Sequence, residues 1–219
     1  MISRAMEDYL KVLSQLHEES GSASTNDVAL AMGVSAASAT NMLKKLAETN
    51  LVIYTPYRGV SLTKSGEKTA LEIIRHHRLL ELYLSEALGV PWDEVHAEAE
   101  KLEHVISEEL EERIANYLGD PTTDPHGHPI PARDGSVIEP QLKSLAELRL
   151  GETATIKRVP DKDPQMLRYL GDLSMRPGTK VHMVDKAPFN GPVTIRVNGE
   201  AKAVGTELAA KVFVGSESG

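Results

Sequence analysis

The sequence predicts a mainly α-helical protein with a winged helix-turn-helix, a second helical part and a small C-terminal all-β barrel. Three observations support this fold class. Apolar residues recur at helical spacing through most of the first 118 residues. Near the N-terminus, two helical segments meet at a glycine and are followed by a β-hairpin pattern. From Leu145 onward, short β-prone runs alternate with Gly, Pro and Asn turns.

The N-terminal segment carries the helix-turn-helix pattern. Residues 4–17 place apolar side chains at a helical period, and a short helix is expected over residues 28–32. Gly33 then allows a tight turn, and Ser35 is a suitable N-cap for a longer helix that runs to about Thr49. Helix, glycine turn and helix at these lengths predict a DNA-binding module.

Two short β-prone runs lie within residues 51–63, around a turn that contains Pro56, Arg58 and Gly59. A helix-turn-helix followed by a hairpin is a winged helix. The alternative is a three-helix structural module that binds protein or nothing. The formal charge of −8 excludes a strongly basic, constitutive nucleic-acid binder, but acidic and basic residues balance over residues 1–75.

The second helix of this module begins with small and hydroxylic side chains, as expected for a helix whose N-terminal end enters the major groove. Asparagine pairs bidentately with adenine, which makes Asn41 the candidate for base readout. Lys44 and Arg58 are expected to hold phosphates. The residues predicted to contact DNA are Ser35, Ala37, Ser38, Thr40, Asn41, Lys44 and Arg58.

Imidazoles and carboxylates gather on two further helices. One runs to about Leu88 and carries His77 and Glu81 one turn apart; the next is expected from Trp92 to about Leu118. Imidazole with carboxylate and no sulfur suits a divalent ion such as manganese, iron or zinc. The alternative is a solvated acidic helix with incidental histidines. On the second helix, the donors fall within one quadrant at His96, Glu100, Glu103 and His104.

The same predicted helix carries a stripe of apolar residues that suits a dimer interface: Leu102, Ile106, Leu110 and Ile114. Residues 120–140 follow as an irregular strap rich in Pro, Gly, Asp and Thr. His126 and His128 lie in this strap, where a His-x-His sequence is more often a solvated pair than a metal site.

Composition excludes several classes of protein. The chain has no cysteine, so disulfides, thiolate catalysis and Cys–zinc sites are ruled out. No apolar run approaches the roughly 20 residues of a membrane span. The N-terminus from Met1 lacks a signal-peptide core, so a soluble cytoplasmic protein is expected. Sparse aromatic residues argue against a base-stacking platform for single strands.

The C-terminal part is predicted to be a small barrel of about 70 residues. Its strands are expected at residues 153–156, 180–184, 193–197 and 212–214, and one helical piece interrupts them at residues 163–173.

Taken together, the chain resembles the diphtheria-toxin-repressor (DtxR/MntR) family of metal-dependent transcriptional regulators, most of all its longer manganese-responsive members. The resemblance implies a winged-helix domain at residues 1–73, a helical metal-binding and dimerisation domain with its strap at 74–140, and an FeoA/SH3-like domain at 141–219. The segments that carry it are Met6 to Leu10, His76 to Glu81, His96 to Val105, Pro125 to Pro131, Arg168 to Gly171, Arg176 to Gly178 and Phe189 to Pro192.

The resemblance also implies ligands. The primary, activating site would consist of Asp8, Glu100, Glu103 and His104. The ancillary site would consist of His77, Glu81, His96 and Asp163. Asp124 stands where some manganese regulators with the extra domain have a cysteine that joins the primary site, and its carboxylate could coordinate in place of that cysteine. Iron-type members have methionine at the position of Asp8 and cysteine at that of Glu100, so carboxylates there favour Mn²⁺, with Fe²⁺ as the other candidate. Lys11 replaces a glutamate of short manganese-type members, which makes their paired-ion arrangement doubtful.

The function expected from this resemblance is a homodimeric, manganese-dependent repressor of metal-uptake genes that binds a double-stranded DNA operator. The alternatives are an iron-responsive regulator of the same family or a metal-binding transport-accessory protein. Enzymatic activity, a membrane and a small organic substrate are not expected. An ion bound by Asp8 and by the later ligands would fix the first helix. Without metal, the clustered carboxylates are expected to repel and release it.

Overall fold

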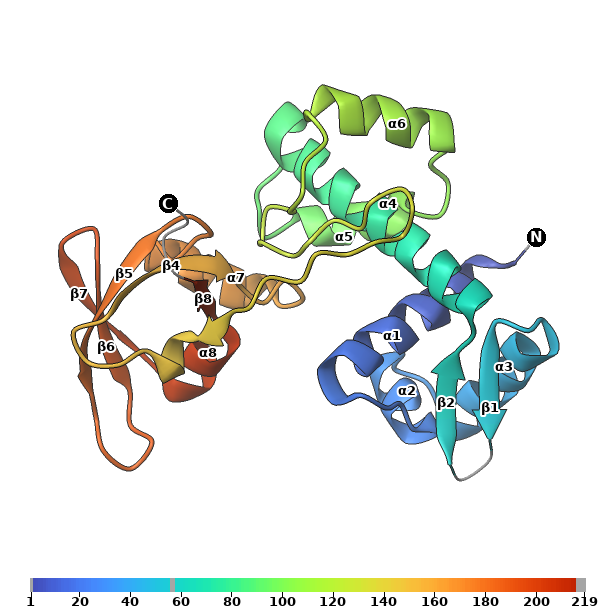
Figure 1. The fold of residues 1–219 in the computed structure, drawn as a ribbon, viewed down its shortest axis with the longest axis horizontal. Coiled ribbons are helices and arrows are strands. Elements are labelled where there is room, and N and C mark those ends of the chain that lie inside the picture. The colour runs from blue at the N-terminus through green and yellow to red at the C-terminus, as the bar shows by residue number, and fades with distance from the viewer. Residues whose placement is uncertain (1, 56–57, 216–219) are drawn as a thin grey trace. The chain divides into compact units, whose positions relative to one another are not determined.

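The computed structural model describes residues 2–55 and 58–215. They fall into two compact units, and the long helix α4 (Lys64–Leu88) contributes to both (Figure 1). The first unit holds the chain up to His77 together with Lys101–Glu111 and Pro131–Val137. The second unit holds Arg78–Glu100, Glu112–Ile130 and the chain from Ile138 onward. No helix among the described residues is long and apolar enough to cross a membrane.

The first helix, α1 (Arg4–Ser20), is three residues longer than its apolar pattern predicts. It ends at Gly21, which takes the left-handed conformation at φ 71° that glycine adopts without steric cost. Its apolar face enters a core in which Leu10, Leu13 and Leu43 are fully buried. Burial of this face positions α1 on the DNA-reading module.

The helix-turn-helix consists of α2 (Thr25–Ala31) and α3 (Ala36–Glu48). The expected start of α2 at residue 28 is wrong, because Ser24 and Asp27 form a capping box that starts the helix earlier. The expected N-cap of α3 is confirmed, since the Ser35 hydroxyl accepts the backbone N–H of Ser38 at 3.2 Å.

The wing consists of β1 (Val52–Thr55) and β2 (Gly59–Leu62), paired antiparallel from Val52↔Leu62 to Thr55↔Gly59. The predicted turn residues Pro56 and Tyr57 lie outside the described residues. Gly59 has φ 114°, and a Cβ there would come within 2.9 Å of the Ala23 carbonyl oxygen. A glycine is therefore needed where the wing meets the helical body.

The helix expected from Trp92 to Leu118 is wrong. Two helices form instead, α5 (Val95–Leu102) and α6 (Glu108–Tyr117). Ser107 starts the second one, because its hydroxyl accepts the backbone N–H of Leu110 at 3.2 Å. The continuous apolar stripe does not form, and Glu103 and His104 lie in the turn between the helices.

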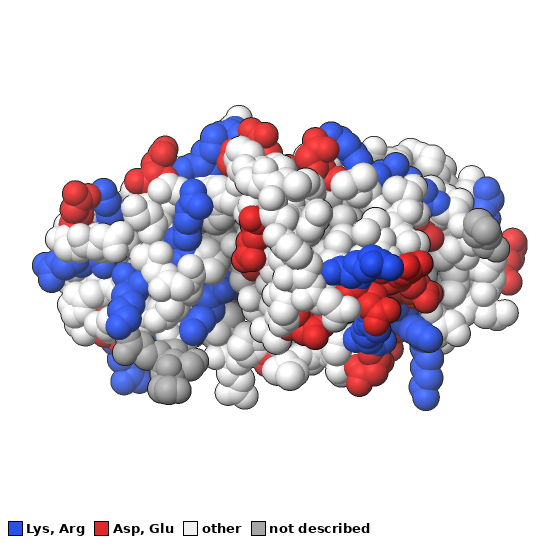
Figure 2. Space-filling view, turned by 90° about the horizontal axis from the view of Figure 1, so that it is seen from above, with Lys and Arg blue, Asp and Glu red and all other residues white. Residues whose placement is uncertain are grey.

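The C-terminal part is an antiparallel sheet in the order β3-β8-β4-β5-β6-β7, covered by short helices around one apolar core. The predicted strands form; two further strands, at residues 143–144 and, after the Asn198-Gly199 turn, at 200–204, were not predicted. Basic residues outnumber acidic ones over residues 143–215, and Figure 2 shows Lys and Arg side chains across this part. The acidic excess of the chain therefore lies in the helical parts. The elements are β3 (Lys143–Ser144), β4 (Thr153–Arg158), α7 (Pro164–Asp172), β5 (Lys180–Lys186), β6 (Val193–Val197), β7 (Glu200–Val204), α8 (Thr206–Lys211) and β8 (Phe213–Gly215).

Candidate metal centres

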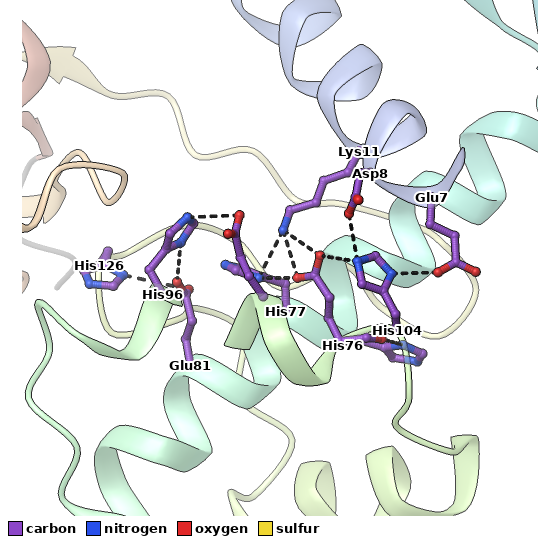
Figure 3. Close-up of polar contacts among 11 residues, drawn as sticks. Glu7, Asp8, Lys11, His76, His77, Glu81, His96, His104 and His126 are labelled. Carbon is purple, nitrogen blue, oxygen red and sulfur yellow. Dashed lines mark hydrogen bonds and ion pairs between the residues drawn. The ribbon is translucent and has the colours of Figure 1, made fainter. Parts of the chain in front are cut away.

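The first cluster of ligand atoms lies in the first unit and joins α1 to the turn after α5. Ligand atoms of Asp8, Glu103 and His104 lie within 4.8 Å of one another. The Nε2 atom of His104 is 2.8 Å from Asp8 Oδ1 and 3.3 Å from Glu103 Oε1 (Figure 3). Two carboxylates and an imidazole at this spacing could hold a divalent ion.

Glu7 orients the imidazole of this cluster. Its Oε2 atom lies 2.6 Å from His104 Nδ1, on the side of the ring away from Asp8 (Figure 3). This contact turns the Nε2 atom toward the two carboxylates, where its lone pair would be available to a metal if Nδ1 carries the proton. Carboxylates hold metal-binding histidines in this way in many proteins. Sequence reasoning missed Glu7, although it is adjacent to Asp8.

Glu103 is the buried carboxylate of the first cluster, with its side chain 1 % exposed. The Lys11 ammonium donates to Oε1 at 2.9 Å and to Oε2 at 2.8 Å, and His77 Nδ1 also contacts Oε2. Burial raises the pKa of Glu103, but His77 and Lys11 outweigh it and hold the pKa below its usual value. Lys11 thus lies beside Glu103 and His104 beside Asp8, while repulsion among the carboxylates in the absence of metal stays a prediction.

The backbone of Glu103 is held by α4. His76 Nδ1 lies 3.2 Å from the Glu103 carbonyl oxygen, and its Nε2 lies 3.3 Å from Glu111 Oε2. Arg75 donates to Glu111 Oε1 at 2.6 Å and to the Pro131 carbonyl oxygen at 2.8 Å. This buried network fixes the turn that presents Glu103 and His104.

The second cluster lies in the second unit. His96 Nδ1 is 2.9 Å from Glu81 Oε1, and His126 Nδ1 is 3.8 Å from Glu81 Oε2. His128 Nδ1 lies 3.5 Å from an oxygen of Asp124 and 3.6 Å from one of Asp161. The members of this second cluster are Glu81, His96, Asp124, His126, His128 and Asp161.

The expectation that His126 and His128 form a solvated pair is wrong. His126 is 0 % exposed, and its Nε2–H donates to the Trp92 carbonyl oxygen at 2.8 Å. This contact leaves the Nδ1 atom facing Glu81. The indole of Trp92 stacks on the imidazole with ring centroids 5.7 Å apart. The strap thus carries a buried, oriented imidazole of the kind that binds metals.

Asp124, which the resemblance places at the primary site, lies instead with the histidines of the strap and folds the strap around its own carboxylate. Its Oδ1 atom accepts the backbone N–H groups of His126 at 2.8 Å and His128 at 3.0 Å. In the strap, the buried atoms that have no hydrogen-bond partner among the described residues are Asp124 Oδ2, His126 Nδ1 and His128 Nδ1. Buried polar atoms are nearly always satisfied, so unpaired oxygen and nitrogen atoms in one cluster fit a bound cation.

The charges of the second cluster act strongly on its histidines. Burial lowers the pKa of His126, but Glu81 and Asp124 outweigh burial and raise it to about 9. Burial also lowers the pKa of His96, but the carboxylates of Glu100 and Glu81 outweigh burial and raise this pKa to about 10. Where a metal is absent, protons on these imidazoles balance the carboxylates.

Glu100, His77 and Asp163 are also expected from the resemblance to be ligands, and each has a contact of its own. Glu100 is exposed, and its carboxylate is 3.5 Å from His96 Nε2. His77 belongs to the first unit and contacts Glu103. Asp163 caps α7 by accepting the N–H groups of Gln165 at 2.9 Å and Met166 at 3.3 Å. The acid beside the histidines is Asp161, two residues earlier, which the sequence pattern did not reveal.

The predicted DNA-contacting side chains lie on α3 and on the wing. Ser35, Ala37, Ser38, Asn41, Lys44 and Arg58 are exposed, and Thr40 is half-buried. The Thr40 hydroxyl donates to the Ala36 carbonyl oxygen at 2.7 Å, which leaves its methyl group as the part available for a base contact.

Three family profiles match the sequence. "Iron dependent repressor, N-terminal DNA binding domain" matches residues 1–60, and "Iron dependent repressor, metal binding and dimerisation domain" matches residues 63–132. The "FeoA domain" profile matches residues 143–215.

Similar proteins cover nearly the whole chain. The iron-dependent repressor IdeR of Mycobacterium leprae is 30 % identical over 95 % of each chain. The diphtheria toxin repressor of Corynebacterium diphtheriae is 27 % identical over 95 % of each. A solved manganese-dependent transcriptional repressor in complex with manganese has a TM-score of 0.89 and 40 % identity over 96 % of this chain and 99 % of its own. The manganese regulator SloR has a TM-score of 0.78 and 32 % identity over 97 % of this chain and 98 % of its own.

These matches confirm both the resemblance seen in the sequence and the predicted fold class. The chain belongs to the iron-dependent repressor family, whose members are metal-dependent, DNA-binding transcriptional repressors and not enzymes.

Proposed function

We propose that this protein is a manganese-activated repressor that binds its operator as a homodimer and controls genes of metal uptake. We choose manganese on the basis of the chemistry of the ligand atoms. Both clusters offer only carboxylate oxygens and imidazole nitrogens. Hard oxygen ligands favour Mn²⁺ over metals that prefer sulfur.

The similar proteins support both manganese and iron. Curated relatives carry the name iron-dependent repressor, whereas several similar solved structures are described as manganese-dependent repressors. The higher identity, 40 % over nearly the whole chain, is to one of the manganese-dependent proteins. Manganese is therefore our first choice and ferrous iron the second.

In the proposed mechanism, the first cluster fixes the DNA-reading module. Asp8 lies on α1, which packs in the same core as α3, whereas Glu103 and His104 follow α5. Asp8, Glu103 and His104 would hold a divalent ion, whose positive charge would keep both carboxylates beside the imidazole. Glu7 keeps the imidazole turned toward them. With α1 fixed, the two recognition helices of a dimer are held near one helical turn of DNA apart, about 34–36 Å.

On DNA, α3 would occupy the major groove. We assign base readout to Asn41, whose amide pairs with adenine, and phosphate contacts to Lys44 and to Arg58 of the wing. Repression would follow from operator occupancy at high intracellular manganese.

DNA binding titrated with three metals tests this function. Fluorescence anisotropy of a labelled fragment from upstream of the gene is recorded in chelator and with Mn²⁺, Fe²⁺ or Zn²⁺, for the wild type and Glu103→Ala. We expect tight binding by the wild type with Mn²⁺ and no metal response in Glu103→Ala. Tight binding in chelator that Mn²⁺ does not change would contradict the proposal, and a stronger response to Fe²⁺ would assign iron.

A further inference from the structure

Lys11 is a buried cation within the first cluster. It lies on α1, three residues after Asp8, and is 7 % exposed. Its ammonium contacts both Glu103 oxygens, at 2.9 and 2.8 Å, and His77 Nδ1 at 3.1 Å (Figure 3). Lysine is among the residues least often buried and is paired when it is. The Lys11 ammonium thus already contacts the carboxylate of Glu103, which we assign as a metal ligand.

We propose that Lys11 sets the metal threshold of this protein, by supplying a resident positive charge that competes with the ion for Glu103. This inference rests on the proposed function, because it concerns the metal that would activate DNA binding. Lys11 acts as a positioning residue: it balances Glu103 in the metal-free protein and weakens binding of a divalent ion.

The two oxygens of Glu103 have different neighbours. Oε1 lies 3.3 Å from His104 Nε2, on the side of Asp8, whereas Oε2 contacts His77. An ion between Asp8 and His104 would therefore approach Oε1, from which Lys11 Nζ is only 2.9 Å away. Like charges this close repel strongly where burial limits screening by water. The ion must displace the ammonium from Oε1 or bind against its charge.

The same contact keeps α1 in place when metal is absent. Lys11 extends from α1, and Glu103 lies in the turn held by His76 and Glu111. Removing the ammonium would leave a buried carboxylate without its lysine, which is strongly destabilising. A divalent ion would then relieve that cost. Loss of Lys11 should therefore lower the stability of the metal-free protein and raise its affinity for metal.

The assignment predicts that loss of the Lys11 charge lowers the stability of the metal-free protein and raises its affinity for Mn²⁺, and both quantities are measured. Lys11→Gln keeps a hydrogen-bond donor but loses the charge, and Lys11→Arg keeps the charge. Lys143→Gln is the matched control, because it breaks the Lys143–Glu152 pair on the C-terminal sheet and changes net charge equally. For each full-length variant, thermal unfolding is followed in chelator, and Mn²⁺ affinity is measured by competition with a fluorescent chelator. The relevant binding step is the one that His104→Ala abolishes.

For Lys11→Gln we expect a lower Tm in chelator and at least tenfold tighter Mn²⁺ binding at this step. Lys11→Arg and Lys143→Gln should bind Mn²⁺ within threefold of the wild type. Unchanged or weaker binding by Lys11→Gln overturns the assignment, since a purely structural lysine would lower Tm without tightening Mn²⁺ binding. Should Lys11→Gln fold only with Mn²⁺, the concentration that restores its circular dichroism replaces the affinity. The midpoint is corrected for the fraction of metal-free variant that is folded, and a corrected Kd above that of the wild type then overturns the assignment.

Failure of the proposed function gives a different result. If His104→Ala removes no Mn²⁺-binding step from the wild type, the first cluster is not a metal centre and both proposals fall. If the step is present in the wild type and unchanged in Lys11→Gln, only the role of Lys11 falls.

Discussion

The two clusters balance their buried carboxylates with different kinds of positive charge. In the first cluster, Glu103 is paired with the ammonium of Lys11, which belongs to another helix. In the second cluster, neighbouring carboxylates raise the pKa of His96 and of His126, so that protons provide the charge. A metal would take the place of the Lys11 contact in the first cluster and of protons on the histidines in the second. The two centres should therefore differ in their response to mutation and to pH.

The largest effect is expected from His126→Ala in the second cluster. The substitution removes a fully buried imidazole and its bond to the Trp92 carbonyl oxygen, which should cost about 3 kcal/mol of unfolding free energy. Mn²⁺ affinity at the second cluster should fall by about 100-fold. Denaturant unfolding in chelator and Mn²⁺ competition measure the two effects. The partly exposed His182 provides the control, and equal effects of His182→Ala would remove the special role of His126.

Asp161 and Asp163 offer a sharper comparison, because they are close in sequence and differ in role. Asp161→Asn should weaken Mn²⁺ binding at the second cluster by about tenfold, since its carboxylate lies beside His128. Asp163→Asn should change neither metal affinity nor stability by more than a few tenths of a kcal/mol, because asparagine caps helices as well as aspartate. Isothermal titration with Mn²⁺ measures both, and the reverse ranking would restore Asp163 as the ligand.

The pH dependence should separate the clusters. The pKa values of His96 and His126 are raised to about 10 and about 9, from 6.5. Their contribution to metal-free stability is thus complete below pH 6.5 and is lost as pH rises through 9 and 10. Metal needs neutral imidazoles, so Mn²⁺ affinity at the second cluster should rise between pH 6 and 8, by up to about tenfold per pH unit for each proton released. Affinity that is independent of pH, with no proton release in calorimetry, would contradict this interpretation.

The smallest effect on Mn²⁺ binding at either cluster is expected from a substitution on the DNA-binding surface. Lys44→Ala should weaken DNA binding and reduce the salt slope, d log K/d log [salt], by about 1, while both Mn²⁺ affinities stay unchanged. Anisotropy at several salt concentrations measures the slope, and Lys202→Ala on the C-terminal sheet is the control. A slope that does not change would mean that Lys44 holds no phosphate.

Much of the fold could be predicted because its signals are local. Apolar periodicity identifies α1 and α4, and Ser35 marks the start of α3. The break between α5 and α6 was missed, although Ser107 before three acidic or apolar helix formers is an ordinary N-cap signal. The hydrophobic stripe across it suggested a single helix, and local capping outweighed that pattern.

The candidate sites were harder to predict, because their partners come from distant segments. Asp8, Glu103 and His104 could be named from the family resemblance, but no spacing reveals that Lys11 reaches Glu103 across 92 residues. The strap carried a visible His-x-His sequence. Its burial depends on Asp124 folding the backbone and on the position of Trp92, which are tertiary features.

The central claim is that the first cluster couples metal to DNA binding. The most direct test is operator affinity as a function of free Mn²⁺ for the wild type, His104→Ala and the control His182→Ala. We expect operator affinity to rise with Mn²⁺ in the wild type and in His182→Ala, and to stay at the chelator value in His104→Ala at every Mn²⁺ concentration. A normal Mn²⁺ response in His104→Ala would contradict it.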